Sequence, residues 1–190
     1  MLVVAAGTIT FSPDVERRGE GTMFDVQRFV EECQTALEEP EATVAVREIV
    51  ERAMSKPGEV LAGLGVPERA TVEKFHVADD LTIINAVWGP HMTVMPHNHE
   101  MPAIIGIYAG GEDNIFWRRV DEQPNLIRAA GARSMRAGDV EALGPNAIHS
   151  VTNPIRGLTG AVHVYLGPFF TIERNEWDPE TLLEGRYNIE

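Results

Sequence analysis

Apolar positions along the chain change their period near residue 70. Before that point they recur every three or four residues, and after it they gather in short segments rich in β-branched and aromatic residues. The first spacing is typical of amphipathic helices and the second of strands. We therefore expect a mainly helical segment over about residues 1–68, a β-rich segment over about 70–175 and a tail over 176–190.

Three helices are predicted in the first segment. The first starts near Thr22, with Asp25 three residues on in a position like that of a capping box. Apolar residues at helical spacing between 46 and 54 predict the second, and a short third helix is expected within residues 56–67. Cys33 falls on the apolar stripe of the first helix, where we expect a packed core thiol without a catalytic role.

The two ends of the chain give weaker signals. Residues 1–11 alternate weakly between apolar and polar, as in a strand, and residues 12–22 are polar and contain glycine, as in a loop. At the other end, Asp178 followed by Pro179 is typical of a helix N-terminus. We therefore expect one or two helical turns in the tail.

The segment after residue 70 is predicted to form a β structure. Its short apolar runs are separated by Gly, Pro, Asp and Asn. Many short strands at nearly regular spacing predict a sandwich or a barrel. Because 190 residues suit one domain, we expect residues 1–190 to form a single domain, with the helices packed on the β structure.

Composition and net charge limit the partners and the cellular location that we expect for this protein. The net charge of −13 argues against nucleic acid or an anionic membrane surface as a partner, since both select for basic patches. A single cysteine excludes an internal disulfide and fits a reducing compartment. The apolar start MLVVAAGTITF lacks a basic leader, and no run approaches the roughly 20 apolar residues that span a bilayer. We expect a cytoplasmic protein.

Candidate chemistry begins with two histidines, His97 and His99, in the stretch MPHNHEMPAIIGIYAGG. In a strand, residues i and i+2 point to the same side, so both imidazoles enter one space. Two imidazoles at this spacing can hold one divalent metal. The same spacing also fits a hydrogen-bonded pair on a surface strand.

A second stretch, GDVEALGPNAIHSVTNP from Gly138 to Pro154, places His149 and Asn153 after a Gly-Pro turn. It resembles the second signature motif of the cupin superfamily, and the stretch around the histidine pair resembles the first. This resemblance implies an all-β fold, the cupin double-stranded β-helix (jelly-roll) barrel with a helical N-terminal segment. It also implies that His97, His99 and His149 meet on one metal.

One departure from the cupin pattern concerns the metal ligands. Many cupins carry a glutamate four or five residues after the second histidine, where this chain has Ala103 and Ile104. The expected ligand set is therefore three neutral imidazoles without a carboxylate, a set that suits Fe, Zn, Cu or Ni.

A third stretch, GAVHVYLGPFF, places His163 and Tyr165 two residues apart. It resembles the Ser-x-His-x-Tyr strand of the cysteine dioxygenases, with Ala161 in place of the serine. The resemblance implies a non-haem iron dioxygenase that oxidises a small thiol to a sulfinate with O₂. Fe(II) is then the expected cofactor, with Zn, Ni, Mn or Cu as alternatives. Tyr165 and His163 are the implied catalytic residues: Tyr165 hydrogen-bonds the bound oxygen or the substrate headgroup, and His163 holds the Tyr165 hydroxyl.

The arginine that binds the substrate carboxylate in that family has no clean match here. The basic residues considered for that role are Arg69, Lys74, His76, Arg118 and Arg119. Two other functions remain open: a three-histidine cupin that cleaves a C–C bond of a diketone or hydroxyketone with O₂, and a non-catalytic cupin that binds a metal or small ligand. The expected partners are a small-molecule substrate and O₂, and the expected state is a monomer or homodimer.

Four further residues are interpreted structurally. We expect Trp88 in the core and Tyr108 and Trp117 in the core or barrel wall. Gly106, inside the strand after the histidine pair, is expected to mark a bulge or a close approach of another backbone.

Overall fold

The structure, a computed structural model, describes residues 23–187. The predicted strand at 1–11 and loop at 12–22 lie outside these residues. The helices are α1 (Val26–Ala36), α2 (Ala42–Met54) and α3 (Pro57–Leu64). The strands are β1 (Thr71–Val77), β2 (Thr82–Trp88), β3 (Thr93–Asn98), β4 (Ala103–Ala109), β5 (Gly111–Val120), β6 (Gln123–Arg136), β7 (Val140–Leu143), β8 (Ile148–Thr152), β9 (Thr159–Tyr165), β10 (Asn175–Trp177) and β11 (Glu184–Arg186). Across the described range, every helix is too short or too polar to cross a membrane.

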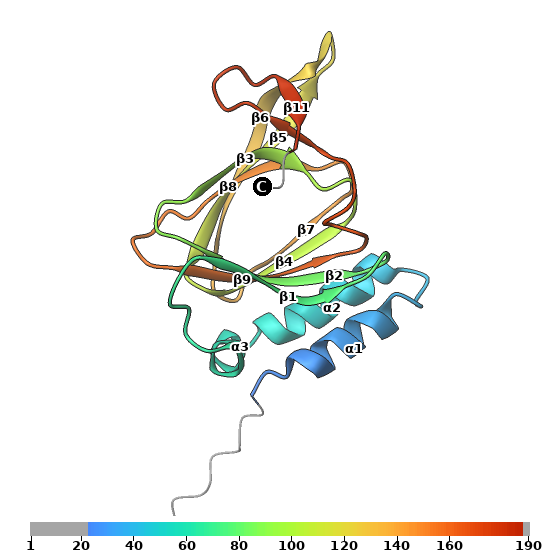
Figure 1. The fold of residues 1–190 in the computed structure, drawn as a ribbon, viewed down its shortest axis with the longest axis vertical. Coiled ribbons are helices and arrows are strands. Elements are labelled where there is room, and N and C mark those ends of the chain that lie inside the picture. Colours follow the sequence, from blue (N-terminus) through green and yellow to red (C-terminus); the bar gives the residue numbers. More distant parts are fainter. Residues whose placement is uncertain (1–22, 188–190) are drawn as a thin grey trace, which may run out of the picture.

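The strands form two sheets that face each other (Figure 1). One sheet has the order β1-β2-β9-β4-β7 and the other the order β11-β10-β3-β8-β5-β6. Neighbouring strands pair antiparallel in both sheets. The predicted double-stranded β-helix barrel with N-terminal helices is confirmed, and the change of period near residue 70 marks the start of β1 at Thr71.

The three helices cover the outer face of the five-stranded sheet (Figure 1). Along β4, Ile104 and Tyr108 pack toward the helices, whereas Ala103, Ile105 and Ile107 belong to the core between the sheets. This alternation follows from the two-residue period of a strand. Both faces of the three inner strands are therefore buried, which explains why β2, β4 and β9 are apolar almost throughout.

The first helix begins later than predicted. Its N-cap is Asp25, whose side chain accepts a hydrogen bond from the backbone N–H of Arg28 at 3.0 Å. Asp25 thus caps the helix itself, because a short acceptor at this position satisfies a free N–H of the first turn. Cys33 lies fully buried in α1 as expected, and burial raises the pKa of its thiol to about 12.

The tail corrects a second expectation. Instead of forming a helix, it adds β10 and β11 to the edge of the six-stranded sheet. Asp178 does accept backbone N–H groups, from Glu180 and Thr181 at 3.0 and 2.7 Å, but these close a single turn between the two strands. Asp178 therefore caps a turn and not a helix, because the residues on either side of it pair as strands.

Gly106 marks the point where α2 lies directly on β4. A Cβ atom at this position would lie 2.6 Å from Cγ of Met54 and 2.8 Å from Cγ1 of Val50. Such distances are well inside van der Waals contact. Side chains of α2, and not another backbone as predicted, therefore make the close approach at Gly106. The absence of a side chain here lets the helical layer reach the sheet.

We expect Gly106→Val to lower the free energy of unfolding by about 1–3 kcal/mol, the usual effect of inserting methyl groups into a packed core. Urea denaturation measures the change. Gly131→Val is the matched control, because this strand glycine of β6 has no heavy atom within 4 Å of the added Cβ. Equal effects of the two substitutions would contradict this account of the helix–sheet contact.

Candidate metal centre

Three buried histidines meet between the sheets. The ligand atoms of His97, His99 and His149 all lie within 4.8 Å of one another. His97 in β3 and His149 in β8 are register partners, so strand pairing sets their imidazoles side by side. His99 follows the end of β3 and contributes the third ring. A group of this size and composition can hold one divalent metal.

Hydrogen bonds fix which nitrogen of two of these rings is free. Nδ1 of His97 lies 2.8 Å from the carbonyl oxygen of Met95, and Nδ1 of His149 lies 2.9 Å from Oδ1 of Asn114. Both partners are acceptors, so each Nδ1 carries the proton and each Nε2 offers a lone pair. Such partners orient metal-binding imidazoles and increase their basicity.

The free nitrogens have a spacing that suits ligands of one ion. Nε2 of His99 and Nε2 of His149 lie 3.4 Å apart. Two nitrogens each about 2.1 Å from one metal lie roughly 3.0–3.4 Å apart at angles of 90–110°. Nδ1 of His99 has no hydrogen-bond partner among the described residues, which leaves that ring free to adjust. The donor set therefore fits a divalent metal.

Burial keeps these imidazoles uncharged. It lowers the pKa of His97 to about 4, because the barrel interior disfavours the imidazolium, and the nearby charge of Arg174 acts in the same direction. Burial also holds the pKa values of His99 and His149 well below the usual range, with the neighbouring histidines adding to the effect. Neutral imidazole is the form that binds a metal, so little proton release has to accompany binding at neutral pH.

The asparagine of the second motif has a structural role. Asn153 Nδ2 donates to the carbonyl oxygens of Trp88, Gly89 and Gly157 at 3.2, 2.9 and 2.9 Å. One side chain thus ties the loop after β2 to the loop before β9. These loops lie at one end of the barrel, which the hydrogen bonds hold together.

His163 and Tyr165 leave β9 toward the same cavity. Nδ1 of His163 and the hydroxyl oxygen of Tyr165 lie 2.9 Å apart, so the expected hydrogen bond is present. The Tyr165 ring centroid lies 5.1 Å from that of His99 and stacks on Phe169 at 3.9 Å. Burial raises the pKa of Tyr165 and lowers that of His163 to about 3, so the pair is neutral.

Arg174, which sequence analysis missed, also lines this cavity. Its side chain is only 4% exposed and its guanidinium lies between two aromatic rings, 3.9 Å from the centroid of Phe169 and 4.1 Å from that of Tyr187. Nε and Nη1 have no hydrogen-bond partner among the described residues. A buried guanidinium with free donors is well suited to bind an anion.

The basic residues considered earlier lie elsewhere, with one exception. Lys74 lines the cavity, where its ammonium lies 4.1 Å above the Phe170 ring. Arg119 instead pairs with Glu184 on the exposed side of the barrel, with two contacts of 2.6 Å. Arg69, His76 and Arg118 do not line the cavity. The only sequence signal for Arg174 is its isolation, since no other Lys or Arg lies between Arg156 and Arg186.

Trp88 packs against the core between the sheets, as expected, and also lines the cavity. Its indole N–H donates to Oε1 of Glu112 at 2.6 Å, and Glu112 is fully buried with no partner for Oε2 among the described residues. Burial raises the pKa of Glu112 to about 7, against the lowering effect of hydrogen bonds from Trp88 and Asn114. Because Asn114 also accepts from His149, this carboxyl group lies behind the metal centre.

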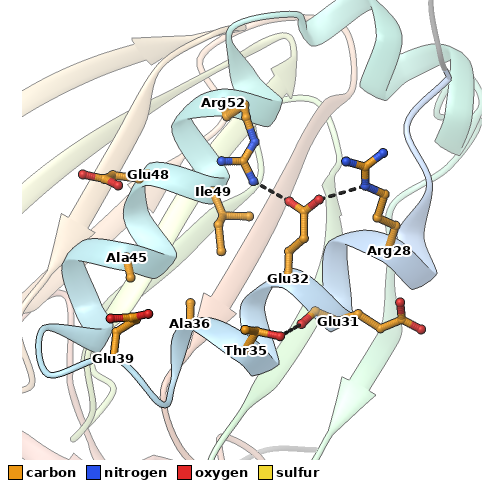
Figure 2. A pocket seen from close by; sticks show the side chains of 10 residues that line it. All are labelled: Arg28, Glu31, Glu32, Thr35, Ala36, Glu39, Ala45, Glu48, Ile49 and Arg52. Atoms are coloured by element: carbon orange, nitrogen blue, oxygen red, sulfur yellow. Dashed lines mark hydrogen bonds and ion pairs between the residues drawn. The ribbon is translucent and has the colours of Figure 1, made fainter.

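A second hollow lies outside the histidine cavity in the described part of the molecule. The histidine cavity has a volume of about 580 Å³. The other, of about 450 Å³, lies between α1 and α2, where Glu32 pairs with Arg28 and Arg52 (Figure 2). Exposed ion pairs such as these contribute little to stability. The residues that line this hollow include no histidine, cysteine or tyrosine. The candidate chemistry therefore belongs to the barrel cavity.

No family model matches the chain. Among solved structures, it is similar to an RmlC-like cupin family protein with a double-stranded β-helix fold from Methanocaldococcus jannaschii (13% identity, TM-score 0.44, 54% of this chain and 84% of that one). It is also similar to a cupin superfamily protein from Desulfitobacterium hafniense (12%, 0.44, 56% and 86%). A third similar structure is an oxalate oxidase (16%, 0.41, 55% and 54%). The sequence identities and TM-scores are low, so these similarities carry no information on activity.

We expect the purified protein to bind one divalent ion and His149→Ala to lose most of it, because the variant removes one of three ligands. The protein is dialysed against buffer with trace iron or zinc, and mass spectrometry then measures the metal bound per chain. His91→Ala is the control, since His91 is exposed and does not line the cavity. Full metal content in His149→Ala would exclude the assigned ligand set.

The pKa of Glu112 gives a prediction for the metal-free protein. Its folded value of about 7 lies above the ordinary 4.5, so the folded state binds the extra proton between these values. The contribution is complete below about pH 4.5 and is lost as pH rises through 7. Relative to Glu112→Gln, wild type should lose on the order of 3 kcal/mol of stability between pH 5 and 8.

Denaturation curves at both pH values measure this difference. Glu180→Gln, an exposed glutamate, should follow wild type at both. If Glu112→Gln also follows wild type, the buried carboxyl group is not perturbed as described.

Proposed function

We propose that this chain is a metal-dependent dioxygenase that oxidises a small anionic thiol to a sulfinate, with iron as its metal. The observation that supports this best is the hydrogen-bonded His163–Tyr165 pair, which lies beside three neutral imidazoles in one buried cavity. A site that only stored a metal would not need a phenol held in that position.

The overall reaction is R–SH + O₂ → R–SO₂H. Sulfur loses four electrons, O₂ gains four, and both oxygen atoms become bonded to sulfur, so no further reductant is needed. Iron bound by the three histidines would supply the one-electron chemistry that O₂ requires and would favour the thiolate form of the substrate.

The phenol of Tyr165 is the proposed hydrogen-bond donor to the substrate. If Nδ1–H of His163 donates to the phenol oxygen, the phenol O–H is free to point into the cavity. This arrangement leaves Nε2 of His163 as a bare lone pair, consistent with its lack of a partner among the described residues. His163 then acts as a positioning residue, and stacking on Phe169 fixes the phenol ring.

Arg174 is the proposed anchor for the negative charge of the substrate. Its charge is held in place by Phe169 and Tyr187, so binding requires little rearrangement of the side chain. A carboxylate would satisfy the free guanidinium N–H groups, which otherwise remain unpaired inside the barrel. The arrangement therefore favours an anionic thiol over a neutral diketone.

On this proposal, Tyr165→Phe should keep the fold and metal content but slow thiol-dependent O₂ uptake by about 10–100-fold, as is usual when a supporting hydrogen bond is lost. An oxygen electrode and a panel that includes cysteine and 3-mercaptopropionate measure the rate. Tyr108→Phe is the matched control: Tyr108 is also a buried, hydrogen-bonded tyrosine, but its hydroxyl binds Asn85 and the residue packs toward the helices.

Two outcomes would reject the proposal in different ways. Turnover of a diketone but of no thiol, with no effect of Tyr165→Phe, would support the C–C bond-cleaving alternative. Absence of turnover with either substrate class in iron-loaded protein would support a binding protein, in which the His163–Tyr165 pair is structural.

A further inference from the structure

We infer that the substrate carries an apolar chain next to its anionic group, and that this chain lies along β3 and β8 and leaves the cavity at a rim formed by Val72, Met92 and Met95. The anionic thiol headgroup rests on the proposed function. The apolar chain follows from the shape and lining of the cavity alone.

The strands supply an apolar strip that leads away from the histidines. In the β3–β8 ladder, the pair His97/His149 is followed toward one end by the pair Val94/Val151. All four residues line the cavity, as does Met92 beyond them, whose carbonyl accepts a hydrogen bond from the backbone N–H of Asn153. Four residues of strand from His149 to Asn153 span about 13 Å. The strip is therefore longer than a three-carbon thiol.

Three exposed apolar side chains line the cavity: Met92 at the far end of this strip, Met95 two residues before His97, and Val72 on β1 of the other sheet. Val72, Met92 and Met95 are 51%, 44% and 40% exposed, and each also lines the cavity. Large apolar side chains gathered at the mouth of a pocket are typical of a surface that meets an apolar ligand. Because the bulge of β3 between Val94 and His97 interrupts the alternation, Val94 and Met95 can both line the same cavity.

The cavity volume agrees with this substrate. At about 580 Å³ it lies within the range that holds drug-sized ligands. A small thiol bound near the histidines and Arg174 would leave water against Val94 and Val151, which is unfavourable for apolar walls. An attached apolar chain would displace that water, while Arg174 holds the charged end.

The test uses thiol-free probes, so that it does not depend on turnover. N-acetyl-, N-hexanoyl- and N-decanoylglycine each carry one carboxylate and an apolar chain of increasing length. Calorimetric titration into zinc-loaded protein should show affinity rising at least tenfold from N-acetyl- to N-hexanoylglycine, since a buried methylene contributes up to about fourfold. N-decanoylglycinamide, which lacks the charge, should bind at least tenfold more weakly than N-decanoylglycine.

Two exposed valines of β1 form a matched pair for mutation. Val72 and Val77 are both 51% exposed, but only Val72 lines the cavity. Val72→Gln should weaken binding of N-decanoylglycine at least fivefold and affect N-acetylglycine much less, whereas Val77→Gln should change neither. For the thiol reaction, N-decanoylcysteine should then show a lower KM than N-acetylcysteine in wild type.

Affinity that does not change with chain length would overturn the inference, as would equal effects of the two valine substitutions. A dimer that dissociates in Val72→Gln, seen by sedimentation, would assign the rim to a subunit interface and also overturn the inference. If the N-acylglycines bind as expected but no thiol is oxidised, the inferred site for an apolar chain is supported and the proposed reaction is rejected.

Discussion

An imidazole inside a dry barrel can bind a cation only if it is neutral and its proton sits on the nitrogen that faces away from the ion. Here the barrel interior removes the charge, and two acceptors, the Met95 carbonyl and the Asn114 amide oxygen, hold the protons of His97 and His149. Much of the remaining architecture supports this arrangement. Register pairing of β3 with β8 sets the two rings together, and Asn153 ties the loops at one end of the barrel.

The two faces of the five-stranded sheet have different roles: the outer face packs against the helices, and the inner face contributes to the candidate site. Its outer face is covered by helices, with Gly106 allowing α2 to reach the backbone of β4. Its inner face presents His163 and Tyr165 to the cavity. Successive side chains of a strand point to opposite faces of the sheet. A substitution on one face therefore makes no direct contact with residues on the other face.

The C-terminal segment completes the cavity. Phe169, Arg174 and Tyr187 come from the chain after β9, and their stacked rings and guanidinium form one wall beside the histidines. Pairing of β10 with β3, through Glu176 and His97, fixes this segment against the strand that carries the histidines. The same segment therefore contributes to the sheet and supplies the cation that faces the cavity.

The sequence alone indicated the change from helix to strand near residue 70 and placed His97 and His99 on one side of a strand, because periodicity and His-x-His spacing are local properties. The double-stranded β-helix and the meeting of these two histidines with His149 were implied by the resemblance to the cupin motifs. The sequence also indicated the His163–Tyr165 pair. It did not indicate Arg174 or Glu112, and it did not indicate that Trp88 lines the cavity as well as packing against the core. The burial of a charged side chain depends on neighbours distant in the chain, such as Phe169 and Tyr187 around Arg174, and only the tertiary structure brings these together. The tail likewise forms strands because an open sheet edge was available for pairing, which no local signal records.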